Sequence, residues 1–97
     1  MLDQLKQLKE LRDRAKRLRE VLAQESITAG SDRAVAIVMD GNQEALSVSV
    51  NPDLLTPTKK EDLEYATREA VTEAVKKSQQ LMARTMQESG DFRLPNF

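Results

Sequence analysis

Residues 3–24 alternate apolar and charged side chains with the period of an α-helix, and this stretch contains neither Gly nor Pro. The apolar positions are spaced three and four residues apart, which is typical of a coiled-coil seam. The seam consists of Leu8, Leu11, Ala15, Leu18 and Leu22, with Leu2 and Leu5 extending it unevenly toward the N-terminus. This spacing predicts a helix whose apolar face is buried, either on a sheet or on a partner helix.

Between residues 26 and 50 the pattern changes to the two-residue alternation of β-strands. Residues 26–29 have β character, and residues 34–39 are apolar on both faces. Residues 45–50 keep Ser47 and Ser49 on one face. The sequence Asp40-Gly41-Asn42 supplies residues that tolerate positive φ, which is a strong hairpin signal. We therefore expect two or three antiparallel strands, with something covering both faces of residues 34–39.

A second helical pattern begins at Thr58-Lys59-Lys60-Glu61, which has the spacing of a capping box. It runs to about Glu88, and Gly90 is placed to end the helix. Its expected inner face consists of Leu63, Ala66, Ala70, Val71, Ala74, Leu81 and Met82. Residues 91–97 contain Pro95 and are expected to form a flexible tail.

The element order predicts an α+β fold in which two long helices flank a small antiparallel sheet. At 97 residues the chain is a single domain, residues 1–97. Tyr65, Phe92 and Phe97 are its only aromatic residues, so the core depends on smaller aliphatic side chains. Because such a chain cannot bury all its apolar positions against itself, we expect a twofold homodimer.

The residue types exclude several classes of chemistry. The sequence has no Cys and no His, which removes thiol catalysis and the usual general base. Residues 40–44 imitate a calcium loop, but Ala45 replaces its glycine and Asn51 its bidentate glutamate. We therefore expect no enzyme activity, catalytic residue, metal, cofactor or small-molecule substrate. No 18-residue apolar run or secretory signal occurs, so we expect a cytoplasmic protein without a membrane segment.

Charge is unevenly distributed although the formal net charge is only −1. Residues 1–25 carry seven basic and five acidic side chains, and residues 26–58 carry one basic and four acidic. Lys9, Arg12, Lys16 and Arg19 each follow a seam residue and form a stripe about 100° from it. Arg14 and Arg17 have acids four residues earlier, so we expect them to be partly neutralised. The stripe is either a solvated surface or a phosphate-binding surface.

The chain resembles the YbaB/EbfC family of bacterial nucleoid-associated proteins from about Leu5 to Met86. The best match is VAIVMDGNQEALSVSVNPDLL, with its strand, turn, strand and following xPxLL pattern. The helix KKEDLEYATREAVTEAVKKSQQLM and the terminal Pro95-Asn96-Phe97 are also similar to the family. The resemblance implies an α-β-β-β-α homodimer with projecting helices that bind duplex DNA.

By position, the resemblance assigns DNA binding to Lys6, Lys9, Arg12 and Lys16 on the first helix, and to Lys76, Lys77 and Arg84 on the second. Arg19 completes the basic stripe of the first helix. We expect a nucleoid-associated protein with low sequence specificity and an architectural or mild regulatory role. The alternative is a non-enzymatic adaptor that binds another protein through the helix seam or a strand edge.

Overall fold

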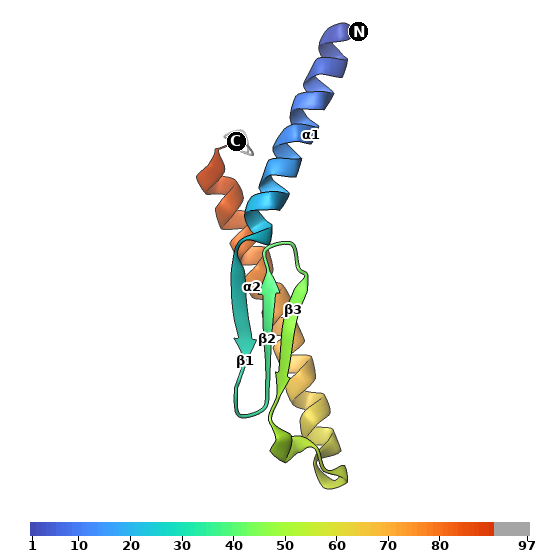
Figure 1. Ribbon diagram of the computed structural model, residues 1–97, viewed down its shortest axis with the longest axis vertical. Helices are drawn as coiled ribbons and strands as arrows, with labels where there is room; N and C mark the ends of the chain where they lie inside the picture. Colours follow the sequence, from blue (N-terminus) through green and yellow to red (C-terminus); the bar gives the residue numbers. More distant parts are fainter. Residues whose placement is uncertain (91–97) are drawn as a thin grey trace, which may run out of the picture.

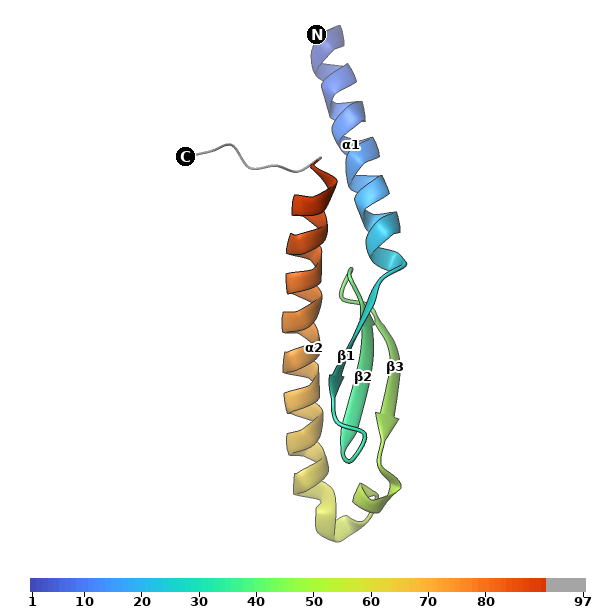
Figure 2. The same ribbon diagram turned by 90° about the vertical axis from the view of Figure 1, so that its left-hand side faces the viewer.

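The computed structural model describes residues 1–90 and confirms the predicted α+β fold, with the element order α-β-β-β-α. The longest dimension is 64 Å, because α1 projects beyond the sheet (Figures 1 and 2). The elements are α1 (Leu2–Ala23), β1 (Ser26–Gly30), β2 (Val35–Asp40), β3 (Ala45–Val50) and α2 (Lys60–Ser89), with short 3-10 turns at Pro52–Leu54 and Pro57–Lys59. The flexible tail expected at residues 91–97 lies outside the described residues.

The three strands form one antiparallel sheet in the order β1-β2-β3. Residues 26–29, which had only β character in the sequence, belong to a full strand paired with β2. α2 packs on β1 and β2 and covers one face of the sheet (Figure 2). The core between them consists of Ala29, Val35, Ile37, Met39, Ala70 and Ala74. Among residues 1–90, no helix covers the other face, and the cover expected there stays a prediction.

The hairpin between β2 and β3 forms as predicted, but its positive φ falls on Gln43 rather than on residues 40–42. Asp40 accepts hydrogen bonds at its Oδ1 from the backbone N–H groups of Asn42 and Glu44, at 2.9 and 3.0 Å. A left-handed residue after such a turn is the usual geometry of a three-residue loop. Gly41 is required for a different reason: a Cβ there would lie 2.6 Å from Leu22 Cδ2.

The capping box predicted at the start of α2 is wrong. Lys59 is the N-cap, and no side chain caps the helix. Pro57 begins a 3-10 turn that includes Thr58, and the Lys59 N–H donates to the Thr56 carbonyl at 3.0 Å. Thr58 is therefore held inside this turn, where its hydroxyl contacts Thr56 Oγ1 at 3.2 Å.

The inner face of α2 is confirmed at Ala70, Ala74 and Leu81, which are buried. Val71 was expected there but is 44% exposed. It lies about 60° around the helix from the buried Ala74, on the side away from Lys77, which contacts β1, and so at the margin of the covered face. Two polar residues, Ser78 and Thr85, are buried instead. Ser78 Oγ donates to the Asp40 carbonyl at 2.8 Å, and this hydrogen bond offsets the cost of burying the Ser78 hydroxyl.

The seam of α1 is buried only where the helix meets the sheet. Leu22 is 1% exposed and Leu18 is partly buried. The four seam residues nearest the N-terminus range from 83% exposed at Leu2 to 55% at Leu11. Within residues 1–90, the predicted packing on the sheet is therefore limited to the last turns of α1.

Candidate nucleic-acid interface

The basic stripe of α1 lies along one exposed side of the projecting helix. Its spacing of three, four and three residues brings successive side chains onto adjacent turns of one face. Lys9, Arg12, Lys16 and Arg19 are all exposed, as is Lys6 closer to the N-terminus. α1 contains seven basic and four acidic residues, so the projecting element carries net positive charge.

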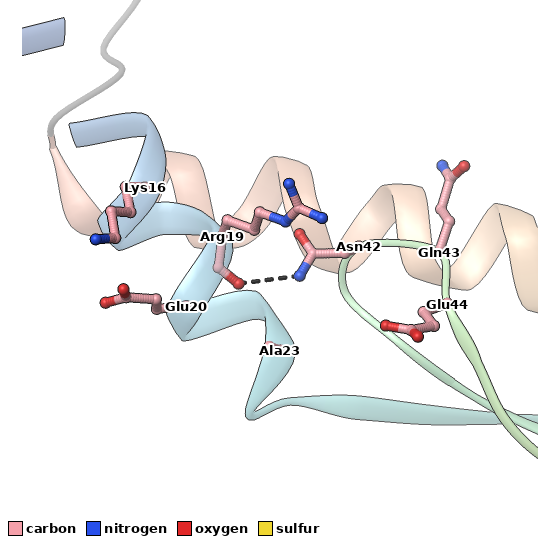
Figure 3. Close-up of a pocket in the computed structure, with 7 residues that line it drawn as sticks. All are labelled: Lys16, Arg19, Glu20, Ala23, Asn42, Gln43 and Glu44. Carbon is pink, nitrogen blue, oxygen red and sulfur yellow. Dashed lines mark hydrogen bonds between the residues drawn. The ribbon is translucent and has the colours of Figure 1, made fainter. Parts of the chain in front are cut away.

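The direction of α1 is fixed by contacts between its last turns and the β2–β3 turn. The Gly41 N–H donates to the Leu22 carbonyl at 3.0 Å. Asn42 Nδ2 donates to the Arg19 carbonyl at 2.9 Å (Figure 3). Because both carbonyls belong to the helix end, these bonds and the buried Leu22 join α1 to the sheet. The hairpin turn thus positions the stripe.

An open cleft of about 710 Å³ lies where the stripe meets this turn (Figure 3). Lys16 and Arg19 share it with two acidic residues, Glu20 and Glu44. None of these four side chains forms an ion pair within the described residues. The base of the stripe is therefore of mixed charge.

Arg14 and Arg17 were expected to be partly neutralised by Glu10 and Asp13, and no close ion pair joins these side chains within residues 1–90. The two ion pairs found in residues 1–90 both lie in α2, at Lys60–Glu64 and Glu73–Lys77. An exposed pair of long side chains gains little in water and loses rotamer freedom, so the spacing alone does not enforce contact. Both arginines are exposed and add to the charge of α1.

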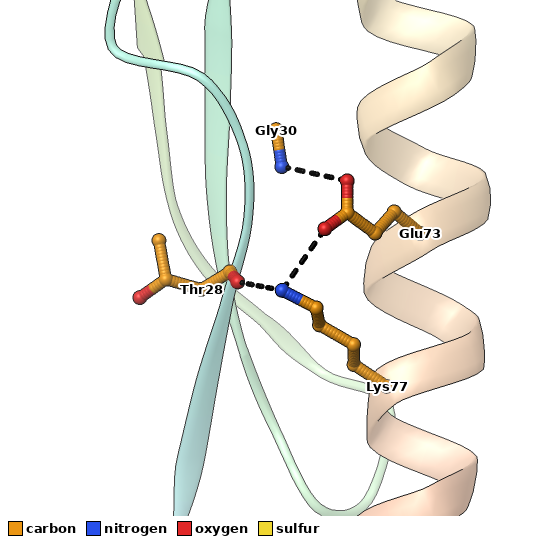
Figure 4. A network of polar contacts seen from close by, with 4 residues as sticks. All are labelled: Thr28, Gly30, Glu73 and Lys77. Carbon is orange, nitrogen blue, oxygen red and sulfur yellow. Dashed lines mark hydrogen bonds and ion pairs between the residues drawn. The ribbon is translucent and has the colours of Figure 1, made fainter.

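Lys77 differs from the other predicted DNA-binding residues because its ammonium group is engaged by the fold (Figure 4). It contacts Glu73 Oε1 at 2.9 Å and donates to the Thr28 carbonyl at 2.9 Å. Glu73 Oε2 also accepts from the Gly30 N–H at 3.3 Å. The hydrogen bond from Lys77, together with that from Gly30, holds the pKa of Glu73 below its ordinary 4.5. This network joins α2 to β1.

Lys76 and Arg84 are exposed on α2. Lys76 points about 100° away from Lys77, so the two consecutive lysines do not form one patch. Arg84 lies two turns beyond Lys77, near the end of α2 that runs beside α1 (Figure 2). The structure therefore groups the α1 residues along one face, and it does not group the three α2 residues with each other.

Comparison with known proteins decides the family. A model of the YbaB/EbfC DNA-binding family matches residues 1–91. The chain belongs to this family. This confirms the resemblance found in the sequence. The family comprises nucleoid-associated DNA-binding proteins and is not a family of enzymes.

Several relatives named as nucleoid-associated proteins match most of this YbaB/EbfC chain. One from Syntrophobacter fumaroxidans is 35% identical over 83 residues, covering 84% of this chain and 76% of the relative. One from Pelotomaculum thermopropionicum is 32% identical over 98 residues, covering 98% and 92%. A third, from Gloeothece citriformis, is 38% identical over 80 residues, covering 81% and 69%.

The sequence did not reveal which residues set the direction of α1. Asn42 and Gly41 were recognised as turn formers, but their contacts with Arg19 and Leu22 join segments about 20 residues apart. The one available signal was the combination of two turn residues with an apolar helix end.

Across residues 1–90, no helix is long and apolar enough to span a membrane. That part of the chain also contains no acidic cluster suited to a metal ion.

Proposed function

We propose that this YbaB/EbfC protein is a cytoplasmic, nucleoid-associated homodimer that binds duplex DNA with low sequence specificity. Its role would be architectural or mildly regulatory. The observation that carries the proposal is the exposed basic stripe on a helix that projects from the sheet. Membership of a DNA-binding family and the names of the relatives support the same function.

The contacts would be made to phosphates by the cationic side chains of both helices. We assign the principal role to α1, through Lys6, Lys9, Arg12, Lys16 and Arg19, and a secondary role to Lys76 and Arg84. Lys77 already uses its ammonium group on Glu73 and Thr28. A lysine has three ammonium protons, so at most one remains for DNA. We therefore give Lys77 a mainly structural part.

Low specificity follows from the side chains available. Lys and Arg contacts to phosphate position a protein on the duplex but read no bases. Tyr65 is the single aromatic residue among residues 1–90, and Arg68 lies over its ring at 5.6 Å. It stands near the start of α2, at the end of the molecule opposite α1 (Figure 1). Stacking on unpaired bases therefore plays no part in the proposed binding.

The homodimer is proposed from the apolar surface that one copy leaves uncovered. Val48 pairs with Ile37 and so lies on the α2 side of the sheet, yet it is 60% exposed. Leu46 is the extra residue at the β-bulge and is also exposed. Both lie on an edge strand, and Val71 of α2 is exposed as well; soluble proteins usually cover apolar surface of this kind. We propose that a second copy covers it.

The alternative function is an adaptor that binds another protein through the exposed seam of α1 or the edge of β3. The observation that favours it is the same apolar exposure on both elements. The two functions differ in which substitutions matter. DNA binding depends on the cations of α1, whereas an adaptor depends on its leucines or on β3.

The decisive experiment reverses three charges of the stripe, with Lys9, Arg12 and Lys16 replaced by Glu. We expect duplex DNA affinity to fall by roughly 100-fold or more, because three phosphate contacts per protomer become repulsive. The measurement is a fluorescence anisotropy titration, with circular dichroism to confirm the fold.

The matched control makes the same change in charge at the other end of the molecule. Lys59, Lys60 and Arg68 are exposed at the start of α2, and their reversal should leave affinity within a few-fold of wild type. Equal losses in both variants would mean that net charge alone matters, and the stripe would then have no special role.

A further inference from the structure

The two edges of the sheet differ in how their outward backbone groups are satisfied. β1 and β3 are the edge strands, since the strand order is β1-β2-β3. An edge strand points every second residue's N–H and C=O away from the sheet, where they can pair with a strand of another molecule. Side chains of α2 bond to such groups of β1, whereas within residues 1–90 no side chain bonds to the backbone of β3.

The register shows which groups of β1 point outward. The Ser31 N–H donates to the Val35 carbonyl at 2.9 Å. Because backbone groups alternate in direction along a strand, the odd-numbered residues of β2 point theirs at β1, and Ala29 is opposite one of them. Thr28 and Gly30, on either side of Ala29, therefore direct their N–H and C=O groups to the outer edge.

Two side chains from successive turns of α2 bond to this outer edge (Figure 4). Lys77 Nζ donates to the Thr28 carbonyl at 2.9 Å, and Glu73 Oε2 accepts from the Gly30 N–H at 3.3 Å. The two side chains also pair with each other at 2.9 Å. A strand added to β1, parallel or antiparallel, would need the same carbonyl and the same N–H.

We infer that Glu73 and Lys77 close the outer edge of β1 against a strand of another copy. Both side chains are more than two-fifths exposed, so as an ion pair alone they contribute little to stability. Their bonds to the strand edge distinguish them from Lys60 and Glu64, the other ion pair of α2, which forms no hydrogen bond to a strand.

Closure of β1 leaves β3 as the open edge of the sheet within residues 1–90. Two open edges on each copy would let sheets join one after another without limit. One open edge instead stops assembly at two copies, as in a closed twofold dimer. This number of copies rests on the homodimer proposed above, whereas the closure of β1 does not.

The first test combines Glu73→Ala with Lys77→Ala in the full chain. The matched control combines Lys60→Ala with Glu64→Ala, which also removes one ion pair from α2 and leaves the net charge unchanged. Sedimentation velocity at rising protein concentration measures the mass, and circular dichroism checks the fold. We expect the first variant to reach about twice the wild-type mass or more, because a second edge is open. The control should match wild type.

The comparison with wild type separates this inference from the proposed homodimer. A folded Glu73/Lys77 variant with the wild-type mass at every concentration would overturn the closure of β1. Equal growth of the control would overturn it too, since loss of any ion pair would then cause assembly. A monomeric wild type would contradict the homodimer alone.

A milder variant keeps the test informative if the double variant does not fold. Lys77→Met retains the apolar stem of the side chain and frees the Thr28 carbonyl alone. We expect a smaller rise in mass than with both substitutions. The wild-type mass in this variant would contradict the inference.

The second test is hydrogen exchange of the Gly30 amide in the Glu73→Ala, Lys77→Ala variant. In dilute protein the loss of its acceptor should raise exchange roughly tenfold over wild type. At high concentration exchange should slow again, because a strand of another copy then accepts from this N–H. Exchange that stays fast at every concentration would mean that the pair only joins α2 to β1, and the inference would be wrong.

Discussion

At the scale of single residues, Gly30 and Gly90 have similar backbone conformations but different surroundings. Their φ values are +83° and +72°, both in the left-handed region that favours glycine. A Cβ at Gly30 would lie 2.0 Å from the Val35 carbonyl oxygen and 3.0 Å from Ala70 Cβ. At Gly90 it would meet nothing within 4 Å. Gly30 therefore sits between β2 and α2 for a steric reason as well as a conformational one.

Gly30→Ala should consequently destabilise the fold more than Gly90→Ala. The left-handed conformation alone costs about 1–2 kcal/mol for alanine. At position 30 the displacement of Val35, and of the bond from the Gly30 N–H to Glu73, adds to this cost. Urea denaturation of both variants measures the difference. Equal losses of unfolding free energy would contradict the close packing at Gly30.

The glycines also show where sequence reasoning at this scale stops. The β2–β3 hairpin was predicted correctly from the composition of residues 40–42, although its positive φ falls on Gln43. The contact of Gly41 with Leu22 was not, because it joins two elements that no local pattern connects. The same holds for Lys77: its pairing with Glu73 has ordinary helical spacing, but its bond to Thr28 depends on the packing of α2 on β1.

At the scale of elements, alternation and periodicity predicted both helices and the β2–β3 hairpin. The start of α2 was predicted wrongly because Pro57 stabilises a 3-10 turn that takes up Thr58. The prediction of the inner face of α2 was correct where the helix covers β1 and β2. It failed at Val71, since helical periodicity does not reveal how many strands a helix covers.

The prediction at the scale of elements concerns strand β3 and the dimer. Val48→Glu would place a charge on the apolar surface that we propose a second copy covers. Burying this carboxylate in the dimer interface should raise the dimer dissociation constant by about 100-fold or more. Sedimentation velocity at several concentrations measures the change.

The control for this prediction is Ser47→Glu, on the other face of the same strand. It should leave the dimer intact. A dimer that survives Val48→Glu and is lost with Ser47→Glu would mean that the open face of the sheet, with Val38 and Ser49, is the interface.

At the scale of the whole molecule, the chain is a sheet covered by one helix, with a second helix projecting from it. The sequence indicated which residues of α1 are apolar and which are basic. It did not indicate that Leu22 alone would be fully buried, with Leu18 partly buried and the seam from Leu2 to Leu11 left exposed. The direction of α1 is set by Gly41 and Asn42, so it depends on tertiary contacts.

This arrangement separates charge along the long axis. The projecting helix is net positive, whereas residues 26–58, which form the sheet and the turns after it, carry one basic and four acidic side chains. A net charge of −1 for the chain conceals this separation. Repulsion from the acidic sheet and its turns favours an orientation in which α1 meets the anionic duplex.

The salt dependence of duplex binding tests this interpretation most directly. Each phosphate contact contributes about −0.9 to the slope of log affinity against log salt concentration. If at least four cations of the helix contact phosphate, the slope should be about −4 or steeper, and similar for duplexes of unrelated sequence. An affinity that changes little between low and physiological salt, or no binding at either, would contradict the proposal that the α1 stripe binds DNA.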